Sequence, residues 1–318
     1  MTSDTMNPAT APGPGIDKIE NNPELHPIEN IYILNNKLIG NTAFLNGRNI
    51  ILENNDITVL NAQDVLIKCS YCRIARVLLL NNLEEIFSFC DFIYDPSMNL
   101  VPSSHGIFQG FNGTVKNLKF YNCNFISDDI DIFSPGGYLN FSNILFKDCM
   151  FELNNCVINR SFGFAVDSFA CKDCYINLKE FPYAHEFIIR FQRTNDKYSK
   201  IVFENTDIIS GTPAAAFIGL WCGSQWDIKF KNCLLTNIVK MFNLNRQVYT
   251  GNGYVDSTAP QGTLVLKDTP VSWSALSNEL EGVNIEVKNN FEEDFDIDSS
   301  VKENSGNLVT SGAVYTAI

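Results

Sequence analysis

The sequence has little of what many enzymes and membrane proteins rely on. Its 318 residues include only 3 His and 3 Trp, and no apolar run approaches the roughly 20 residues that a membrane-spanning helix needs. The nucleotide-binding glycine patterns do not occur. The N-terminus has neither the basic region nor the apolar region of a secretory signal. We therefore expect no membrane span, no cofactor, and a protein that is made in the cytoplasm and not secreted.

Basic residues are also scarce. There are 23 Lys and Arg against 36 Asp and Glu, which gives a formal net charge of −13. Because nucleic acids are bound mainly through contacts to their phosphates, this deficit argues against a nucleic-acid partner.

The chain does contain a short phrase that recurs many times. It reads apolar–x–apolar–x–Asn/Asp–Cys/Thr–x–apolar, and its clearest copies begin at positions 118, 144, 169, 201 and 228, with a further copy at 264. Weaker copies lie at 50–57, 65–72 and 285–291. Recurrence at intervals of 20–50 residues indicates an array of stacked structural units.

The phrase predicts a strand, a tight bend and a second strand. Alternating apolar residues place side chains on one face of an extended strand, and Asn or Asp suits a bend because it tolerates left-handed backbone. Stacked units of this kind bury a continuous core. We predict an all-β fold, a single right-handed parallel β-helix of about nine or ten coils over 31–297. A β-sandwich is the alternative, but its turns usually recur every 8–12 residues.

The 10 Cys first suggest disulfides or zinc, since Cys69–Cys72 and Cys171–Cys174 are Cys-x-x-Cys pairs. However, Cys occupies one slot of the repeat, at 123, 149, 174 and 233. Stacking of small buried thiols explains this placement without a metal. We expect free, buried thiols and no metal, in keeping with a reducing cytosol.

The two ends of the chain differ from the repeat. Residues 1–30 contain five Pro after Met6 and no strand pattern, which suits either a disordered tail or an extended arm that docks on a partner. An acidic run at 291–298 ends the repeat, and a linker with a short helix over 313–318 is predicted after it. Such a short helix needs a packing partner, so we expect oligomer contacts from Val309, Ala313, Val314, Tyr315 and Ile318.

The ending Asn307-Leu-Val-Thr-Ser-Gly-Ala-Val-Tyr-Thr-Ala317 resembles a linker found in fibre and tail proteins of bacteriophages, in particular the crass-like phages of gut bacteria. In those proteins the linker tends to lead into a trimerising or chaperone region, whereas this chain stops there. The resemblance covers about a dozen residues. It implies a homotrimeric virion protein whose trimer-forming part is present, supplied by another subunit, or removed.

Polysaccharide-cleaving enzymes also use β-helices, so carboxylates need separate attention. The Asn-Thr-Asp at 205–207 and the pair Asp128 and Asp129 resemble elements of polygalacturonases, and His105 is a third candidate. Their order along the chain differs from that family's order, and the repeat alone accounts for Asn-Thr at the bend. We therefore expect no site of this type.

The densest carboxylate group in the repeat is formed by Asp128, Asp129 and Asp131. We expect a solvated loop here. A cation site and a depolymerase carboxylate pair are the alternatives. The three Trp are expected to pack in the core or between subunits, with sugar stacking as the alternative.

Together these features predict a structural protein of a phage virion: a fibre, spike or decorating appendage. Its N-terminal arm (1–30) would dock to other virion proteins, its rod (31–297) would project, and its loops or its C-terminal segment (298–318) would meet partners or a host surface glycan. The alternative is a polysaccharide depolymerase of a tail spike.

Overall fold

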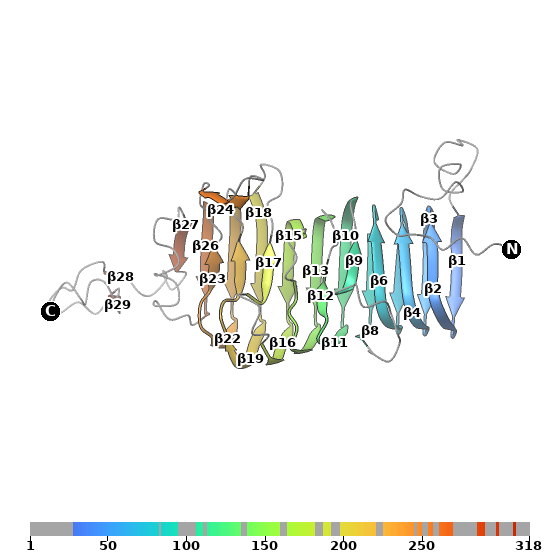
Figure 1. The fold of residues 1–318 in the computed structure, drawn as a ribbon, viewed down its shortest axis with the longest axis horizontal. Coiled ribbons are helices and arrows are strands. Elements are labelled where there is room, and N and C mark those ends of the chain that lie inside the picture. Colours follow the sequence, from blue (N-terminus) through green and yellow to red (C-terminus); the bar gives the residue numbers. More distant parts are fainter. Residues whose placement is uncertain are drawn as a thin grey trace.

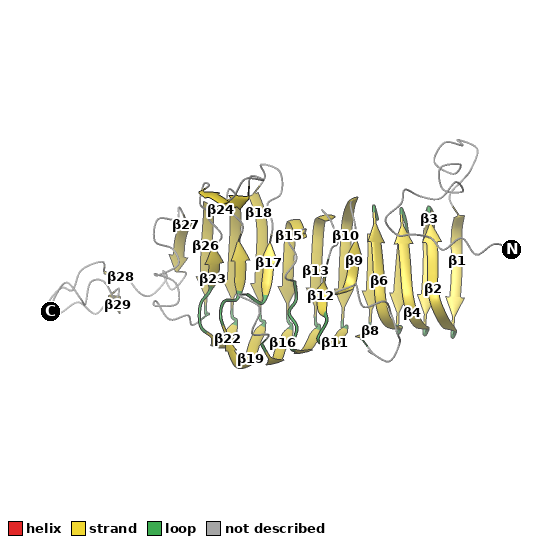
Figure 2. Ribbon diagram, in the orientation of Figure 1, coloured by secondary structure: helices red, strands yellow, loops and turns green. Residues whose placement is uncertain are grey.

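The computed structural model of the chain is a long stack of parallel β-strands (Figure 1). It describes residues 28–82, 84–94, 106–110, 113–134, 139–159, 164–181, 187–191, 198–220, 225–244, 247–249, 254–256, 261–269, 285–289, 297–298 and 308–309. Within these residues the chain forms strands and loops without a helix (Figure 2). The parallel β-helix of about ten coils predicted from the sequence is confirmed, and the sandwich is excluded. The right-handed sense of the coil stays a prediction.

One face of the stack, sheet A, runs along the whole rod. It has 11 strands, all of which pair in parallel with their neighbours. They are β1 (Ile28–Leu34), β3 (Gly47–Glu53), β5 (Leu66–Ser70), β7 (Glu84–Ser88), β10 (Gly113–Tyr121), β13 (Leu139–Lys147), β15 (Phe164–Lys172), β18 (Tyr198–Glu204), β21 (Gln225–Lys231), β26 (Gln261–Lys267) and β27 (Ile285–Asn289).

A second face, sheet B, receives the chain after each bend. Its strands are β2 (Lys37–Leu45), β4 (Asp56–Gln63), β6 (Arg73–Leu80), β8 (Asp91–Ile93), β11 (Asn124–Asp128), β14 (Met150–Asn154), β16 (Tyr175–Glu180), β19 (Asp207–Ala214) and β22 (Leu234–Ile238). The first three have eight or nine residues, and each covers the part of its coil that later coils divide between two separate strands.

After β6, the long strand of the early coils is replaced by two separate strands. The start of β6 pairs with β8, while Val77–Leu79 pairs with the next strand, β9. The third face, here called sheet C, consists of β9 (Gly106–Gly110), β12 (Asp131–Phe133), β17 (Ile189–Phe191), β20 (Ile218–Leu220) and β23 (Phe242–Leu244). Asn159 bridges β12 and β17, so sheet C is continuous.

Two short pairs of strands lie outside the predicted pattern or at its limits. The hairpin β24 (Gln247–Tyr249) and β25 (Tyr254–Asp256) is antiparallel, and β28 (Ile297–Asp298) pairs with β29 (Leu308–Val309) in parallel. The helix predicted for 313–318 lies outside the described residues, as do 1–27. The boundaries expected at 30/31 and 297/298 stay predictions.

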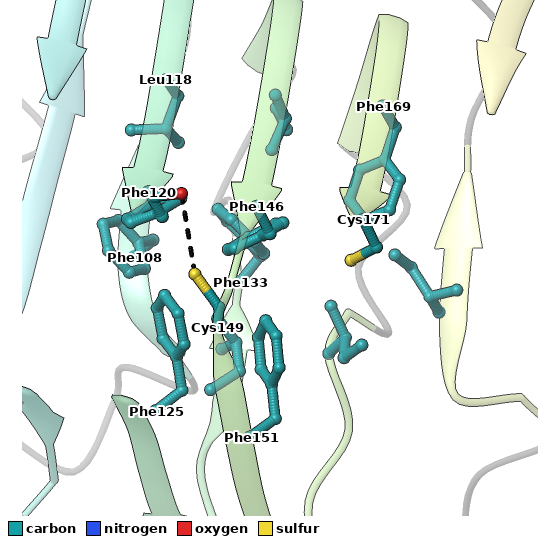
Figure 3. Close-up of a cluster of buried hydrophobic side chains, with 14 of the residues drawn as sticks. Phe108, Leu118, Phe120, Phe125, Phe133, Phe146, Cys149, Phe151, Phe169 and Cys171 are labelled. Carbon is teal, nitrogen blue, oxygen red and sulfur yellow. Dashed lines mark hydrogen bonds between the residues drawn. The ribbon is translucent and has the colours of Figure 1, made fainter. Parts of the chain in front are cut away.

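The core is a set of stacked side-chain columns, many of them phenylalanines (Figure 3). On sheet A, Phe120 lies between Phe87 and Phe146, with ring centroids 5.3 Å and 4.7 Å away and nearly parallel planes. On sheet B, Phe125 stacks on Phe92 and Phe151 at 4.9 Å and 4.6 Å. In-register parallel strands about 4.8 Å apart bring identical rings to stacking distance, so the repeat itself selects phenylalanine for these columns.

The bend between sheets A and B has the left-handed backbone that the phrase predicts. Ten described residues occupy it with φ between 48° and 57°, and eight of them are Asn or Asp: Asn35, Asn54, Asn122, Asp148, Asp173, Asn205, Asn232 and Asp268. Their side chains also connect coils, since Asn232 Nδ2 donates to Asn205 Oδ1 (3.0 Å) and Asn205 Nδ2 to Asp173 Oδ1 (2.9 Å). The other two bend residues are Tyr71 and Phe89.

The residue after the bend is a buried hydrogen-bond donor. Cys123 Sγ donates to the carbonyl of Tyr121 (3.4 Å) in its own coil and of Phe87 (3.5 Å) in the preceding coil. Thr206 Oγ1 donates to the equivalent carbonyls, those of Glu204 (2.9 Å) and Cys171 (3.3 Å). The slot therefore takes Asn, Cys or Thr, because each is small and carries a donor for carbonyls that the bend leaves partly unsatisfied.

The nine described cysteines are free and buried, as the stacking interpretation requires. Both Cys-x-x-Cys pairs span the same bend. Their first members, Cys69 and Cys171, lie in the phenylalanine column of sheet A, in register with Phe87 and Phe203. Their second members, Cys72 and Cys174, fill the donor slot. Burial raises the pKa of the Cys69 and Cys171 thiols well above its ordinary value, and these thiols stay protonated.

Replacement of Thr206 tests the donor role of this slot. Thr206→Val keeps the shape but removes the donor, so it leaves buried carbonyls without a partner and should cost about 1–2 kcal/mol of unfolding free energy. Thr206→Cys supplies the donor that other coils use, and its loss should stay below about 1 kcal/mol. Urea denaturation of both variants measures the difference, and equal losses would show that the slot selects only for size.

Candidate functional site

The three carboxylates singled out in the sequence lie in two different environments. Asp128 ends β11 and Asp129 occupies a left-handed bend (φ 61°), and both are exposed. Asp131 begins β12 and is buried at 1% exposure. They therefore straddle the corner between sheets B and C instead of converging on one surface.

Two of these carboxylates hold neighbouring coils together. Asp129 Oδ1 accepts a hydrogen bond from Asn155 Nδ2 (2.5 Å), and Asp131 Oδ1 accepts one from the Val157 amide (3.1 Å). Asp131 also acts on its surroundings: burial first, and then the charge of Asp131, raises the pKa of the Cys156 thiol to about 12. These contacts show that Asp129 and Asp131 have a structural role. The depolymerase carboxylate pair stays a prediction.

The Asn-Thr-Asp element at 205–207 is explained by the coil. Asn205 is the left-handed bend residue, Thr206 is the buried donor, and Asp207 begins β19 on the outer side of sheet B. Asp129 belongs to a coil three turns earlier, so it lies at least about 14 Å from Asp207 along the rod at the usual strand spacing. That separation exceeds the 5–10 Å between the two carboxyl groups of a glycosidase.

Several predicted residues fall outside the part of the chain that the structure describes. Among them are the arm residues 1–27, His105, and the C-terminal contact residues Ala313, Val314, Tyr315 and Ile318. Val309 is described only as part of the short β29 strand. Of the tryptophans, Trp226 is described, and it is buried at 1% exposure as the packing interpretation expected.

The described residues contain neither a cluster of three metal-ligating side chains nor a helix long and apolar enough to cross a membrane. Their most unusual titratable group is Glu85 on β7. It lies in the apolar inner column of sheet A, in register with Ile67 on one side and Leu118 on the other, and is 0% exposed.

The Glu85 carboxyl has a single described partner. Its Oε1 accepts a short hydrogen bond from Asn82 Nδ2, which also donates to the Ala62 carbonyl (3.0 Å), while its Oε2 is buried without a described partner. Burial raises the pKa of Glu85 to about 8, although the Asn82 contact opposes the shift. Glu85 is therefore mainly a neutral acid at pH 7, and it lies in the coil where the long second strand divides into β8 and β9.

A surface feature missed by the sequence analysis lies on the outer side of sheet B. Met150 and Tyr175 are neighbours in one column of the register, with 36% and 38% of their surfaces exposed. Leu234, 45% exposed, belongs to the same column but is separated from Tyr175 by Asp207. Ile126, 38% exposed, extends this apolar surface to the neighbouring column. In the sequence, this surface is visible only as apolar residues in the second strand of each repeat. Which of them face outward depends on the position of the bend. Contiguous exposed apolar residues are typical of protein–protein contacts.

Substitution of Glu85 tests its burial through the pH dependence of stability. Because its folded pKa (about 8) is above the unfolded value near 4.5, its contribution to stability is fully present below pH 4.5 and is lost as the pH rises to 8. The wild type should therefore lose unfolding free energy relative to Glu85→Gln as the pH rises, by about 1.4 kcal/mol per pH unit between pH 5 and 8. Denaturation curves over this range measure this difference. Glu53→Gln, at an exposed position of the same sheet, is the control, and a Glu85→Gln difference that stays constant over this range would contradict burial of an acid at this position.

Comparison with known proteins gives no relative for this chain: it matches no protein-family model, no curated protein and no solved structure. What is established is the fold, a parallel β-solenoid whose three faces enclose a stacked aromatic core.

Proposed function

We propose that this chain is a structural protein of a bacteriophage particle, a fibre, spike or decorating appendage that mediates attachment or assembly contacts. The observation that carries the proposal is the uninterrupted rod. Sheet A runs through 11 strands in parallel register, and one connected core cluster extends from Phe44 to Leu266. Such a stack resists bending and separates its two ends, which is what a projecting appendage requires.

The fate of the candidate catalytic residues supports this choice over an enzyme. The bend and the donor slot account for Asn205 and Thr206, while Asp129 and Asp131 hydrogen-bond to the adjacent coil. The polar residues that could be read as chemistry are thus used by the stack itself. The sequence at 307–317 supplies the second argument, because it resembles the linkers of phage fibre and tail proteins.

A homotrimer is part of the proposal. The exposed apolar residues Ile126, Met150 and Tyr175 give each rod a flank that a second copy would cover, and a closed ring of copies buries it on every subunit. Other virion proteins are expected to bind the N-terminal arm or the C-terminal end. The particle is the expected location, after synthesis in the host cytoplasm.

The trimer is tested by measuring mass in solution with light scattering. A single chain has a mass of 35.7 kDa, and the wild type should have three times this mass. A Met150→Glu/Tyr175→Glu double variant should lower the mass, because charges would have to be buried in the contact. Tyr32→Glu, which changes a side chain with 59% exposure on sheet A, serves as the control. A monomeric wild type would contradict the trimer, and an unchanged mass in the double variant would place the contact elsewhere.

Location within the particle tests the function itself. Gold-labelled antibodies against the rod should decorate intact particles of a phage that encodes this chain, at a defined position on the head, collar or tail. Purified protein incubated with host capsule should release no reducing or unsaturated sugar ends. Absence of label from intact particles would overturn the virion proposal, and release of sugar ends would favour the depolymerase.

A further inference from the structure

Two bend residues break the rule that the rest of the column follows. Tyr71 and Phe89 occupy the left-handed bend with φ of 53° each, in the same column where eight other coils have Asn or Asp. Bulky side chains are disfavoured in this conformation, so each of the two residues carries backbone strain. The pair also interrupts the amide ladder that joins neighbouring bends. Such strain persists where the surrounding structure enforces it, and it gathers at functional sites.

The two rings form a projecting aromatic pair. Their centroids are 5.1 Å apart and their planes differ by 6°, so each covers one face of the other. Tyr71 is nevertheless 58% exposed and Phe89 50% exposed. The next bend residues along the column are the much shorter Asn54 and Asn122, which cannot cover the outer halves of the ring faces turned toward them. Each ring therefore offers an apolar face to solvent.

Polar side chains flank this pair on both sides of the bend. Ser70 and Ser88 precede the rings in register on sheet A. Arg73 and Asp91 follow in register on sheet B, with Arg73 exposed and Asp91 half-exposed. Asp91 is held by a hydrogen bond from Asn124 Nδ2 (2.8 Å). Hydroxyls, a carboxylate and a guanidinium thus lie within two residues of the two exposed rings along the chain.

We propose that the Tyr71–Phe89 pair is a binding site for a neutral saccharide, a hexose or an N-acetylhexosamine within a surface glycan. A pyranose ring has an apolar C–H face that stacks on aromatic rings and a rim of hydroxyls that needs donors and acceptors, and this site supplies both. Asp91 and the serines accept from hydroxyls, while Arg73 donates to ring and hydroxyl oxygens. The inference rests on the proposed role in attachment and names the class of its ligand.

A purely structural explanation makes a different prediction. Near this bend β6 and β8 share only two register pairs, Arg73 with Asp91 and Ile74 with Phe92, so a stacked pair could serve to join these two coils. In that case, replacement of the rings would lower stability and nothing else. Asn at either position relieves the strained backbone and restores the residue type found in the other coils, so the variants Tyr71→Asn and Phe89→Asn separate the two explanations.

The experiment measures binding of the full-length protein to an array of bacterial surface oligosaccharides that includes neutral hexose and N-acetylhexosamine repeats. Calorimetric titration with the strongest binder follows. We expect the wild type to bind at least one neutral oligosaccharide, and the Tyr71→Asn/Phe89→Asn variant to bind it at least tenfold more weakly while its unfolding midpoint stays within a few degrees. Tyr32→Asn, a change at a similarly exposed tyrosine away from the bend, should bind like the wild type.

Three results would overturn the inference: no binding by the wild type to any neutral saccharide, undiminished binding by the double variant, or a loss of binding that follows a loss of folding. The particle labelling remains a separate measurement. If the antibodies label particles but the protein binds no saccharide on the array, the saccharide site is rejected and the virion role is kept. If the protein binds a saccharide but is absent from particles, only the virion role is rejected.

Discussion

The rod depends on one backbone conformation, the left-handed residue between sheets A and B. That residue turns the chain through the corner of each coil, and the residue after it places a donor under the carbonyls that the corner exposes. Both requirements are local, so a coil built on them can be copied many times. Stacking then follows, because equal corners hold the flanking strands in register and bring equal side chains above one another. The phenylalanine columns and the buried thiols are consequences of this arrangement.

Much of the fold could be predicted because these requirements leave a visible pattern in the sequence. Asn122, Asp148 and Asp173 read as bends, and alternating apolar residues on either side read as strands. Sheet C could not be predicted in the same way. Its strands β12, β17, β20 and β23 have three residues each, too few to show an alternation.

Other features were missed because they contradict the preferences that sequence reasoning uses. Tyr71 and Phe89 occupy bends although aromatic residues do not favour them. The weak copy of the phrase at 65–72 includes Tyr71, but the pattern does not mark either ring as exposed. Glu85 lies in the core beside a second glutamate, Glu84, whose outward position is the ordinary one. For the candidate site, the pattern correctly assigned Asn205 and Thr206 to the coil. It gave no means to see which outward-facing side chains lie together, because that depends on register between coils far apart in sequence.

The change in cross-section at β6 has a mechanical consequence. Bends in the first coils, at 35, 54, 71 and 89, are 19, 17 and 18 residues apart, whereas the later spacings are 25–36 residues. The early coils thus have a shorter perimeter and a smaller cross-section than the later coils. A beam's flexural rigidity rises steeply with its depth. Under a sideways load we therefore expect the rod to bend first in its N-terminal coils, while the wider coils stay straighter.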